Sequence, residues 1–252
     1  MELLREGAKE LGLVLDSRHL AQFERYYREL EDWNQRLNLT AVSGYAEVQQ
    51  KHFLDSLTCL LALPQKRAAP TIPDTMPLQH PTGALRVVDV GSGAGFPGLP
   101  LKIMLPEVRL TLIEATGKKA AFLEHMVKTL ALADVEVLSA RVENVGRQPE
   151  HREKYDLVLA RAVAHLSVLA EYCLPLCRLG GRMIAQKGES AALEAQQATR
   201  AIRLLGGSEA CVKPVALPGV WRDHHLVVVD KLAGTPEAYP RRVGVPSKRP
   251  LH

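Results

Sequence analysis

Apolar side chains in the first part of the chain recur at intervals of three and four, which is the spacing of amphipathic helices. Three helices are predicted: a short one over residues 3–13, a longer one capped by Asp16 or Ser17, and a third that begins after Gly44. The apolar face of the longer helix consists of Leu20, Phe23, Tyr27, Leu30, Trp33 and Leu37. No strand is predicted among these helices, so residues 1–63 are expected to form a helical cap.

From Leu85 onward, short β-branched runs alternate with helical segments. This alternation predicts an α/β fold with a parallel, doubly wound sheet. Two later runs, 211–217 and 224–232, are separated by a short turn and predict an antiparallel hairpin at the sheet edge. The other strands are predicted over 85–90, 109–114, 134–138, 155–160 and 181–186, and helices over 117–130, 165–178 and 191–205.

The pattern also divides the chain. Residues 64–84 contain five prolines and few large apolar residues, which predicts a linker or surface loop between cap and core. The core is expected over residues 85–235, and residues 236–252 form a basic tail.

One stretch carries the clearest candidate chemistry: LRVVDVGSGAGFPGLPLKI, residues 85–103. It predicts a buried strand, a turn with Gly91, Gly93 and Gly95, and the first turn of a helix. Glycines in such a turn let a ligand approach the bare backbone. A strand, a glycine turn and a helix N-terminus together are typical of a nucleotide-type site.

Two cofactor classes fit this turn. The frame Gly93–Gly98 matches G-x-G-x-x-G and suits a nicotinamide dehydrogenase, whereas Asp89–Gly95 matches the D-x-G-x-G-x-G of S-adenosylmethionine (SAM)-dependent methyltransferases. A carboxylate at Asp89 would repel a pyrophosphate by about 4 kcal/mol at close range but would attract the sulfonium and ammonium of SAM. We therefore favour SAM. The terminal hairpin agrees, and predicts a mostly parallel seven-stranded, Rossmann-like methyltransferase sheet.

Ligands of open α/β sheets lie beyond the carboxyl ends of the strands. Glu114 there can accept from both ribose hydroxyls; the alternative is a surface glutamate. Val142 and Glu143 are placed to contact adenine, with an exposed loop acid as the alternative for Glu143. Arg161 lies in an apolar run and needs a partner, either the ligand or a structural salt bridge. Lys187 is a candidate RNA contact or a solvated lysine.

The acceptor of the methyl group is narrowed by motifs the sequence lacks. No N/D-P-P-Y segment follows the fourth strand, where methylases of exocyclic amines usually carry one, and no cysteine lies where attack on pyrimidine C5 would need it. A ring nitrogen such as guanine N7 has a lone pair and no proton to lose, so its methylation needs alignment but no general base. No catalytic residue is assigned.

Charge adds a second candidate surface. The 252-residue chain has a net charge of +4 and a basic tail, in which Arg241, Arg242, Lys248 and Arg249 could bind phosphates. The alternative is a solvated, partly disordered terminus. We expect this tail to form no regular helix, because prolines and a glycine interrupt it. Arg36, Lys51 and His52 of the cap could extend the same surface.

Other classes are not supported. The four cysteines show no metal-ligand spacing, so no metal site is predicted. The N-terminus has no signal-peptide pattern, and no apolar run reaches about 20 residues, the length of a membrane span. We expect a soluble, cytoplasmic monomer.

Several motifs together resemble one family, RsmG (GidB), the bacterial guanine-N7 methyltransferases of small-subunit rRNA. They are NLTAV (38–42), KHFLDSL (51–57), VVDVGSGAGFPGLPLKI (87–103), EAT-x-KK-x-x-FL (114–123), ARVEN (140–144), D-x-V-x-ARAVA (156–164) and YPRRVGVPSKRPL (239–251). The match runs nearly end to end, although the proline-rich segment is longer than we expect for the family.

The resemblance implies SAM as cofactor, methylation of a guanine in 16S rRNA, and 16S rRNA or the small ribosomal subunit as partner. It further implies cofactor contacts by Gly91, Phe96, Glu114, Ala115, Thr116, Val142, Glu143 and Arg161. The alternatives are a methyltransferase for another RNA, a protein or a small molecule, a nicotinamide dehydrogenase, and a SAM-sensing RNA-binding module without turnover.

Overall fold

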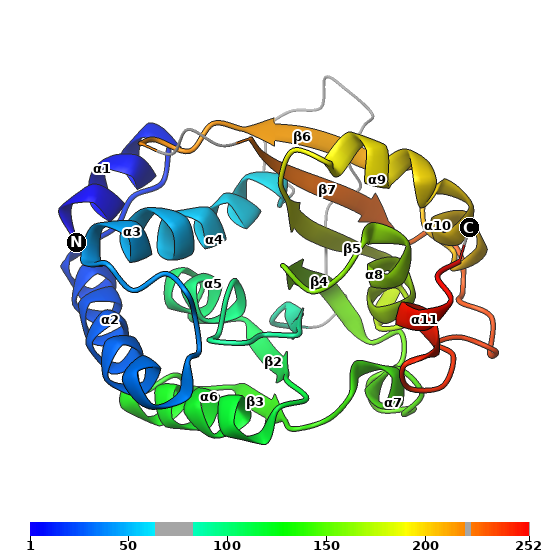
Figure 1. Ribbon diagram of the computed structural model, residues 1–252, viewed down its shortest axis with the longest axis horizontal. Coiled ribbons are helices and arrows are strands. Elements are labelled where there is room, and N and C mark those ends of the chain that lie inside the picture. Colours follow the sequence, from blue (N-terminus) through cyan, green and yellow to red (C-terminus); the bar gives the residue numbers. More distant parts are fainter. Residues whose placement is uncertain (64–82, 220–222, 252) are drawn as a thin grey trace.

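The structure is a computed structural model that describes residues 1–63, 83–219 and 223–251. A seven-stranded sheet has the order β3-β2-β1-β4-β5-β7-β6 and separates two layers of helices (Figure 1). The strands are β1 (Arg86–Val90), β2 (Arg109–Ile113), β3 (Val135–Leu138), β4 (Tyr155–Arg161), β5 (Cys177–Lys187), β6 (Cys211–Val215) and β7 (His224–Asp230). The proline-rich linker predicted over 64–84 falls almost wholly outside the described residues.

The sheet is mixed in the way the sequence predicts. Strands β1 to β5 pair in parallel, and β7 is antiparallel to both β5 and β6. The predicted hairpin is therefore confirmed at the sheet edge, with β7 inserted between β5 and the outermost strand β6.

Side chains of the central strands alternate between two hydrophobic cores, as a pleated sheet requires. Val87 and Leu157 belong to the core shared with the cap helices. Val88 and Val158 belong to the opposite core. The helices of the α/β part are α5 (Gly98–Met104), α6 (Gly117–Thr129), α7 (Val142–Val145), α8 (Leu166–Cys173), α9 (Ala191–Gln197) and α10 (Thr199–Leu204).

Two helix boundaries differ from the predictions. The helix expected over 165–178 ends at Cys173, because Pro175 lacks a backbone N–H and cannot continue the helical hydrogen bonds. Strand β5 consequently begins at Cys177, four residues earlier than predicted. The segment expected as one helix over 191–205 is divided into α9 and α10 at Ala198.

The predicted cap consists of α1 (Glu2–Glu10), α2 (Ser17–Leu37) and one further helical segment. Asp16 caps α2 in a capping box: its Oδ1 accepts from His19 N at 2.8 Å, and Asp16 N donates to His19 Nδ1 at 3.2 Å. The further segment changes geometry along its length, as α3 (Tyr45–Val48), the π-helix η1 (Gln49–Leu54), α4 (Asp55–Leu57) and the 3-10 helix η2 (Thr58–Ala62).

The cap is joined to the sheet by an aromatic cluster rather than standing apart. Tyr26 of α2 stacks on Phe96 beside the glycine turn with ring centroids 5.4 Å apart, and Phe53 packs against both. Tyr26 also donates from its hydroxyl to the Ala94 carbonyl at 2.5 Å. These contacts place the cap directly over the glycine turn.

The tail is folded onto the core, in contrast to the expectation of a terminus without regular helix. It includes a short helix, α11 (Val245–Lys248), beside α8 (Figure 1). Arg152 anchors the chain before it by donating to the Thr235 carbonyl at 2.7 Å and the Tyr239 carbonyl at 2.7 Å.

Candidate active site

The glycine turn follows β1 and requires glycine at more than one position. Gly93 has φ +56°, and a Cβ there would meet nothing nearer than the Gly91 carbonyl at 3.9 Å, so open space lies beside the backbone. Gly95 has φ +95°, and a Cβ there would approach Leu99 and Tyr26 to 2.5 Å. Gly93 therefore leaves room for a ligand, whereas Gly95 lets the cap pack on the turn.

A pocket of about 210 Å³ opens at the carboxyl ends of β1, β2 and β3. We call it the glycine-turn pocket. It is lined by Val90, Gly91, Ile113, Glu114, Ala115, Thr116, Ala140, Arg141, Val142, Glu143, Val163 and Tyr172. Six predicted cofactor residues thus come together from segments far apart in sequence: Gly91, Glu114, Ala115, Thr116, Val142 and Glu143.

Glu114 connects the end of β2 to the turn. Its Oε2 accepts from Gly93 N at 3.0 Å, and its Oε1 accepts from Thr116 N at 2.7 Å. Only 7% of the residue is exposed, so it is not the surface glutamate of the alternative interpretation. A carboxylate has about four lone-pair positions, which leaves acceptor capacity for hydroxyl groups of a ligand.

Glu143 is also buried, which contradicts the alternative of an exposed loop acid. Its Oε1 accepts from Gly244 N of the tail at 2.9 Å. The tail therefore supports one wall of the glycine-turn pocket. Tyr172 of α8 lines the same wall and was missed in the sequence, where it is one aromatic residue in an apolar helix.

Asp89 supports the turn from behind instead of facing the pocket. It is fully buried, and its Oδ2 accepts from Gly98 N at 3.0 Å. Burial raises the pKa of Asp89 to about 7, which weakens the charge that the sequence argument assigned to it. A Cβ on Gly98 would meet Asp89 Oδ2 at 2.8 Å, so the last glycine of the G-x-G-x-x-G frame is needed for this packing.

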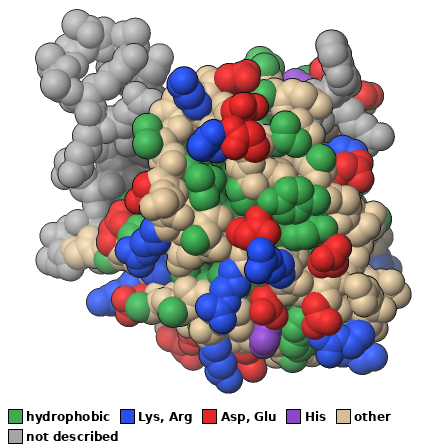
Figure 2. All heavy atoms as spheres, turned by 90° about the vertical axis from the view of Figure 1, so that its left-hand side faces the viewer, with side chains coloured by type: hydrophobic (Ala, Val, Ile, Leu, Met, Phe, Trp, Pro, Cys, Tyr) green, Lys and Arg blue, Asp and Glu red, His purple; other side chains and the backbone are tan. Residues whose placement is uncertain are grey.

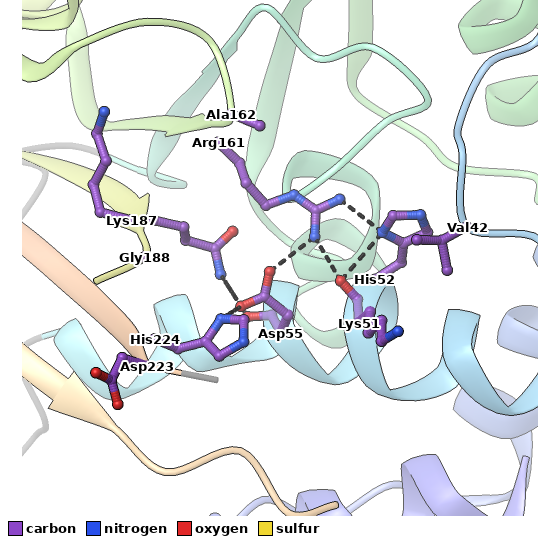
Figure 3. A pocket seen from close by; sticks show the side chains of 11 residues that line it. Val42, Lys51, His52, Asp55, Arg161, Ala162, Lys187, Gly188, Asp223 and His224 are labelled. Atoms are coloured by element: carbon purple, nitrogen blue, oxygen red, sulfur yellow. Dashed lines mark hydrogen bonds and ion pairs between the residues drawn. The ribbon is translucent and has the colours of Figure 1, made fainter. Parts of the chain in front are cut away.

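A second cavity, of about 410 Å³, lies where the cap meets the ends of β4 and β5 and the start of β7 (Figure 3). We call it the cap–core pocket. It is lined by Val42, Lys51, His52, Asp55, Arg161, Ala162, Gln186, Lys187, Gly188, Asp223 and His224.

Arg161 lines the cap–core pocket and not the glycine-turn pocket. Its Nη1 donates to Asp55 Oδ2 at 2.9 Å and to the Lys51 carbonyl at 3.1 Å (Figure 3). Its guanidinium lies 4.9 Å from the centroid of the Phe96 ring. The structural salt bridge left open by the sequence is thus present. Phe96, also predicted as a cofactor contact, is 5% exposed and packed between Tyr26 and His52.

His52 is held as a neutral ring. Burial and the nearby Arg161 charge lower its pKa to about 4. Because a guanidinium can only donate, Nδ1 accepts from Arg161 Nη2 at 3.1 Å, and Nε2, 2.8 Å from Thr40 Oγ1, then carries the ring proton. Rather than extending a basic surface, His52 fixes the position of Arg161.

Asp55 is the common partner of the polar side chains in this pocket. Besides Arg161, Gln186 Nε2 donates to Asp55 Oδ1 at 3.2 Å, and His224 Nδ1 lies 3.4 Å from the same oxygen. Asp55 and His224 were missed as site residues. Asp55 had one available signal: it is an acid within the mostly apolar KHFLDSL segment.

The predicted RNA contacts have different environments. Lys187 is not a solvated lysine, because its Nζ donates to Glu194 Oε2 at 2.7 Å and to the Ala164 carbonyl at 2.5 Å. Arg241 forms a bidentate pair with Glu171, which is fully buried, with Nη2 to Oε2 at 2.6 Å. Arg241 is therefore a structural anchor of the tail.

The remaining tail cations are exposed: Arg242, Lys248 and Arg249. On the cap, by contrast, basic and acidic side chains are interspersed over the face in Figure 2, and Arg36 and Lys51 pair with Asp32 and Glu47. The suggested extension of the basic surface onto the cap is therefore not supported.

Within residues 1–63, 83–219 and 223–251, no three His, Cys, Asp or Glu side chains gather as metal ligands would. In the same part of the chain, no helix has the length and apolar character to cross a bilayer.

Solved structures with this fold include methyltransferases. A protein from Corynebacterium glutamicum, 20% identical, aligns with a TM-score of 0.52 over 83% of this chain and 90% of that one. The 16S rRNA (adenine(1408)-N(1))-methyltransferase from Catenulisporales acidiphilia, 14% identical, aligns with a TM-score of 0.50 over 61% of this chain and 88% of that one. These similarities show the fold alone.

Sequence comparison is more specific. The family model described as GidB, rRNA small subunit methyltransferase G, matches residues 19–226. Proteins named ribosomal RNA small subunit methyltransferase G from Roseiflexus sp. (strain RS-1) and Dehalococcoides mccartyi (strain CBDB1) are 52% and 45% identical over 252 and 251 residues, each covering 100% of both chains. The resemblance in the sequence motifs is confirmed, and the chain belongs to the rRNA small subunit methyltransferase G (GidB) family.

Proposed function

We propose that this protein transfers a methyl group from SAM to N7 of one guanine in 16S rRNA, in direct in-line fashion. The observation that carries the proposal is the glycine-turn pocket, which lies at the carboxyl ends of β1 to β3 in a chain of this family. The small ribosomal subunit or its rRNA is the partner, and the cytoplasm is the compartment. The protein is expected to act as a monomer.

The glycine-turn pocket has the hydrogen-bond acceptors and the apolar surface that SAM needs. Gly91 and Gly93 offer a close backbone approach for the methionine part, and Glu114 offers acceptors for ribose hydroxyls. Val142 and Glu143 offer an apolar surface and an acceptor at the position expected for adenine. A ribose-binding acid such as Glu114 fits both SAM and a dinucleotide, so the preference for SAM rests on the family to which the chain belongs.

The reaction requires no general base from the protein. SAM supplies an electrophilic methyl group on a sulfonium. Guanine N7 already carries the attacking lone pair, so the protein has to align acceptor and donor and to exclude water. His52 agrees with this requirement, because the neutral ring already accepts a hydrogen bond from Arg161 and is not free to remove a proton.

RNA binding is assigned to the exposed tail cations Arg242, Lys248 and Arg249. They lie on the segment that supports Glu143 through Gly244, so phosphate contacts there would form next to the cofactor pocket. Lys187 and Arg241 are engaged in ion pairs and are proposed to act by holding structure near the RNA.

The proposal is tested by incubating the protein with methyl-labelled SAM and 30S subunits from a strain that lacks this methylation. We expect label at a single position, identified as 7-methylguanine by nuclease digestion and mass spectrometry. Free 16S rRNA, tested in parallel, distinguishes naked RNA from the assembled subunit as substrate. Label transferred to protein or a metabolite while all RNA stays unlabelled would refute the proposal.

A further inference from the structure

The glycine-turn pocket and the cap–core pocket lie on two sides of one short segment. Arg161 and Ala162 line the cap–core pocket, whereas Val163 lines the glycine-turn pocket. A Cβ on Gly91 would come within 2.8 Å of Val163, so the segment is packed tightly on the turn. A molecule in the cap–core pocket would therefore be a neighbour of a cofactor bound at the turn.

The cap–core pocket has the size of a small-ligand binding site. Its volume of about 410 Å³ is roughly twice that of the glycine-turn pocket and falls within the usual range for small-ligand pockets. Enzymes that modify a base buried in a stack extrude it into such a cavity. The pocket lies over the ends of β4 and β5, on the opposite side of β1 from β2 and β3.

We propose that the cap–core pocket binds the target guanine, extruded from its stack, and that the Asp55–Arg161 pair reads its O6 and N1–H. This inference rests on the proposed function and names the residues that select the base. It assigns Arg161 to the acceptor, where the sequence expectation assigned it to the cofactor.

The hydrogen-bonding pattern of the pair fits guanine. A guanidinium beside a carboxylate presents a donor next to an acceptor, which is complementary to guanine O6 next to N1–H. Adenine presents the reverse pattern, an amino donor next to a bare N1, and would meet donor with donor. Three of the five N–H groups of Arg161 have partners among the described residues, which leaves donor capacity for O6.

The pair is rigid enough to discriminate. Asp55 is 5% exposed and is fixed by Arg161, Gln186 and His224, while Arg161 is fixed by neutral His52 and the Lys51 carbonyl. Hydrogen-bonding groups held in this way need little reorganisation, and so cost little free energy, when the base enters. A base of the wrong pattern would leave buried polar groups unpaired.

The charge of Asp55 also suits the chemistry of the transfer. As the C–S bond breaks, its electron pair stays on sulfur, and the N7 lone pair forms the new N–C bond. Positive charge thus moves from the sulfonium to the purine, and N1–H becomes more acidic. A carboxylate that accepts from N1–H is therefore bound more strongly in the transition state than in the ground state.

The first test compares Asp55→Asn with Asp230→Asn. Asp230 pairs with Arg182, which in turn donates to the Ala62 carbonyl of the cap, so this control breaks another Asp–Arg pair at the cap–core contact but lines neither pocket. For Asp55→Asn we expect kcat/KM on 30S subunits to fall about 10- to 100-fold, the loss of one charge-assisted hydrogen bond. Its SAM affinity should stay within about twofold. The control should stay within about twofold in both quantities.

The second test locates the base in the wild-type protein. Reconstituted 30S subunits carry 6-thioguanosine at the mapped methylation site and are irradiated with the protein and S-adenosylhomocysteine. We expect the cross-linked peptide to contain residues 51–55, 161–162 or 186–188. This measurement does not depend on whether a variant folds.

The outcomes separate the inference from the proposed function. A wild type that labels 7-methylguanine but cross-links only elsewhere, such as at residues 239–251, overturns the inference and leaves the function standing. The inference is also overturned if Asp55→Asn keeps its kcat/KM, or loses SAM affinity in parallel, which would assign Asp55 to joining cap and core alone. A wild type that labels no RNA overturns both.

Discussion

Single residues determine whether the turn after β1 can hold a ligand. Gly93 combines a positive φ with open space at its Cβ position, whereas the neighbouring glycines are confined by Val163 or by Leu99 and Tyr26. Glu114 then binds the Gly93 amide and lies in the pocket wall. The chemistry of the pocket therefore depends on a backbone site that bears no side chain.

Substitution of Gly93 by Asp should lower the affinity for SAM by about 100-fold or more. The side chain would occupy the open space and place a second carboxylate next to Glu114. Isothermal titration calorimetry with SAM measures this. Gly12→Asp is the matched control, because Gly12 also has positive φ with nothing within 4 Å of its Cβ position, but lies in the cap. Unchanged SAM affinity in Gly93→Asp would mean that the ligand lies elsewhere.

Asp89 should make stability depend on pH. Its pKa is raised to about 7 in the folded protein, so the native state binds the proton more tightly than the unfolded chain. The contribution of Asp89 to the free energy of unfolding is fully present below about pH 4. It is lost as the pH rises through about 7, at about 1.4 kcal/mol per pH unit. Urea unfolding from pH 5 to 8 should show Asp89→Asn gaining stability relative to wild type as pH rises. A constant difference between the two proteins would contradict this.

At the scale of elements, the tail is part of the core. Arg241 pairs with buried Glu171 of α8, and Gly244 donates to Glu143 at the start of α7. The tail thus joins two helices of the α/β part and backs one wall of the glycine-turn pocket. Its removal would do more than delete positive charge.

The variant Arg241→Met should lose about 3 kcal/mol of unfolding free energy, because among the described residues Glu171 would keep only the backbone N–H of residue 241 as partner. SAM affinity should fall with it, since Glu143 loses its support. Thermal unfolding and calorimetry measure both effects.

The contrasting variant removes only the exposed charges, by replacing Arg242, Lys248 and Arg249 with serine. Stability and SAM affinity should stay near wild type, while binding to 30S subunits weakens and the slope of log K against log salt falls by about 2. If this variant binds RNA normally, the tail is structural alone.

At the scale of the whole molecule, cap and sheet share one hydrophobic core. Leu4 and Leu57 of the cap belong to the same buried cluster as Val87 and Leu157 of the sheet. The residue ranges predicted as cap and core are therefore continuous in packing. The cap–core pocket lies along this contact and depends on it.

We accordingly expect cap and sheet to unfold in one cooperative transition, with equal calorimetric and van't Hoff enthalpies. Leu57→Ala, within the cap, should lower the midpoint measured by Trp33 fluorescence and by circular dichroism equally, at a cost of about 2–5 kcal/mol. Two separate transitions would show that the cap is an independent domain.

Local patterns in the sequence were sufficient to predict which residues follow the strand ends at the glycine-turn pocket. These are the glycine turn after β1, Glu114 after β2, and Val142 and Glu143 after β3. These could be predicted because each residue lies directly past a strand, and parallel strands bring their carboxyl ends to one edge. The helix end at Cys173 could also have been inferred from Pro175, which has no backbone N–H to continue the helix.

Tertiary structure decided which ion-pair partners long side chains take from positions about 70 to 110 residues away in the chain. Arg161 turns to Asp55 of the cap, and Arg241 turns to Glu171, because a buried charge takes whichever partner the packing brings near. Neither pairing leaves a signal in local spacing. The sequence by itself therefore determined the fold class and six residues of the glycine-turn pocket. Only the packing of cap on sheet created the second pocket and placed its polar groups.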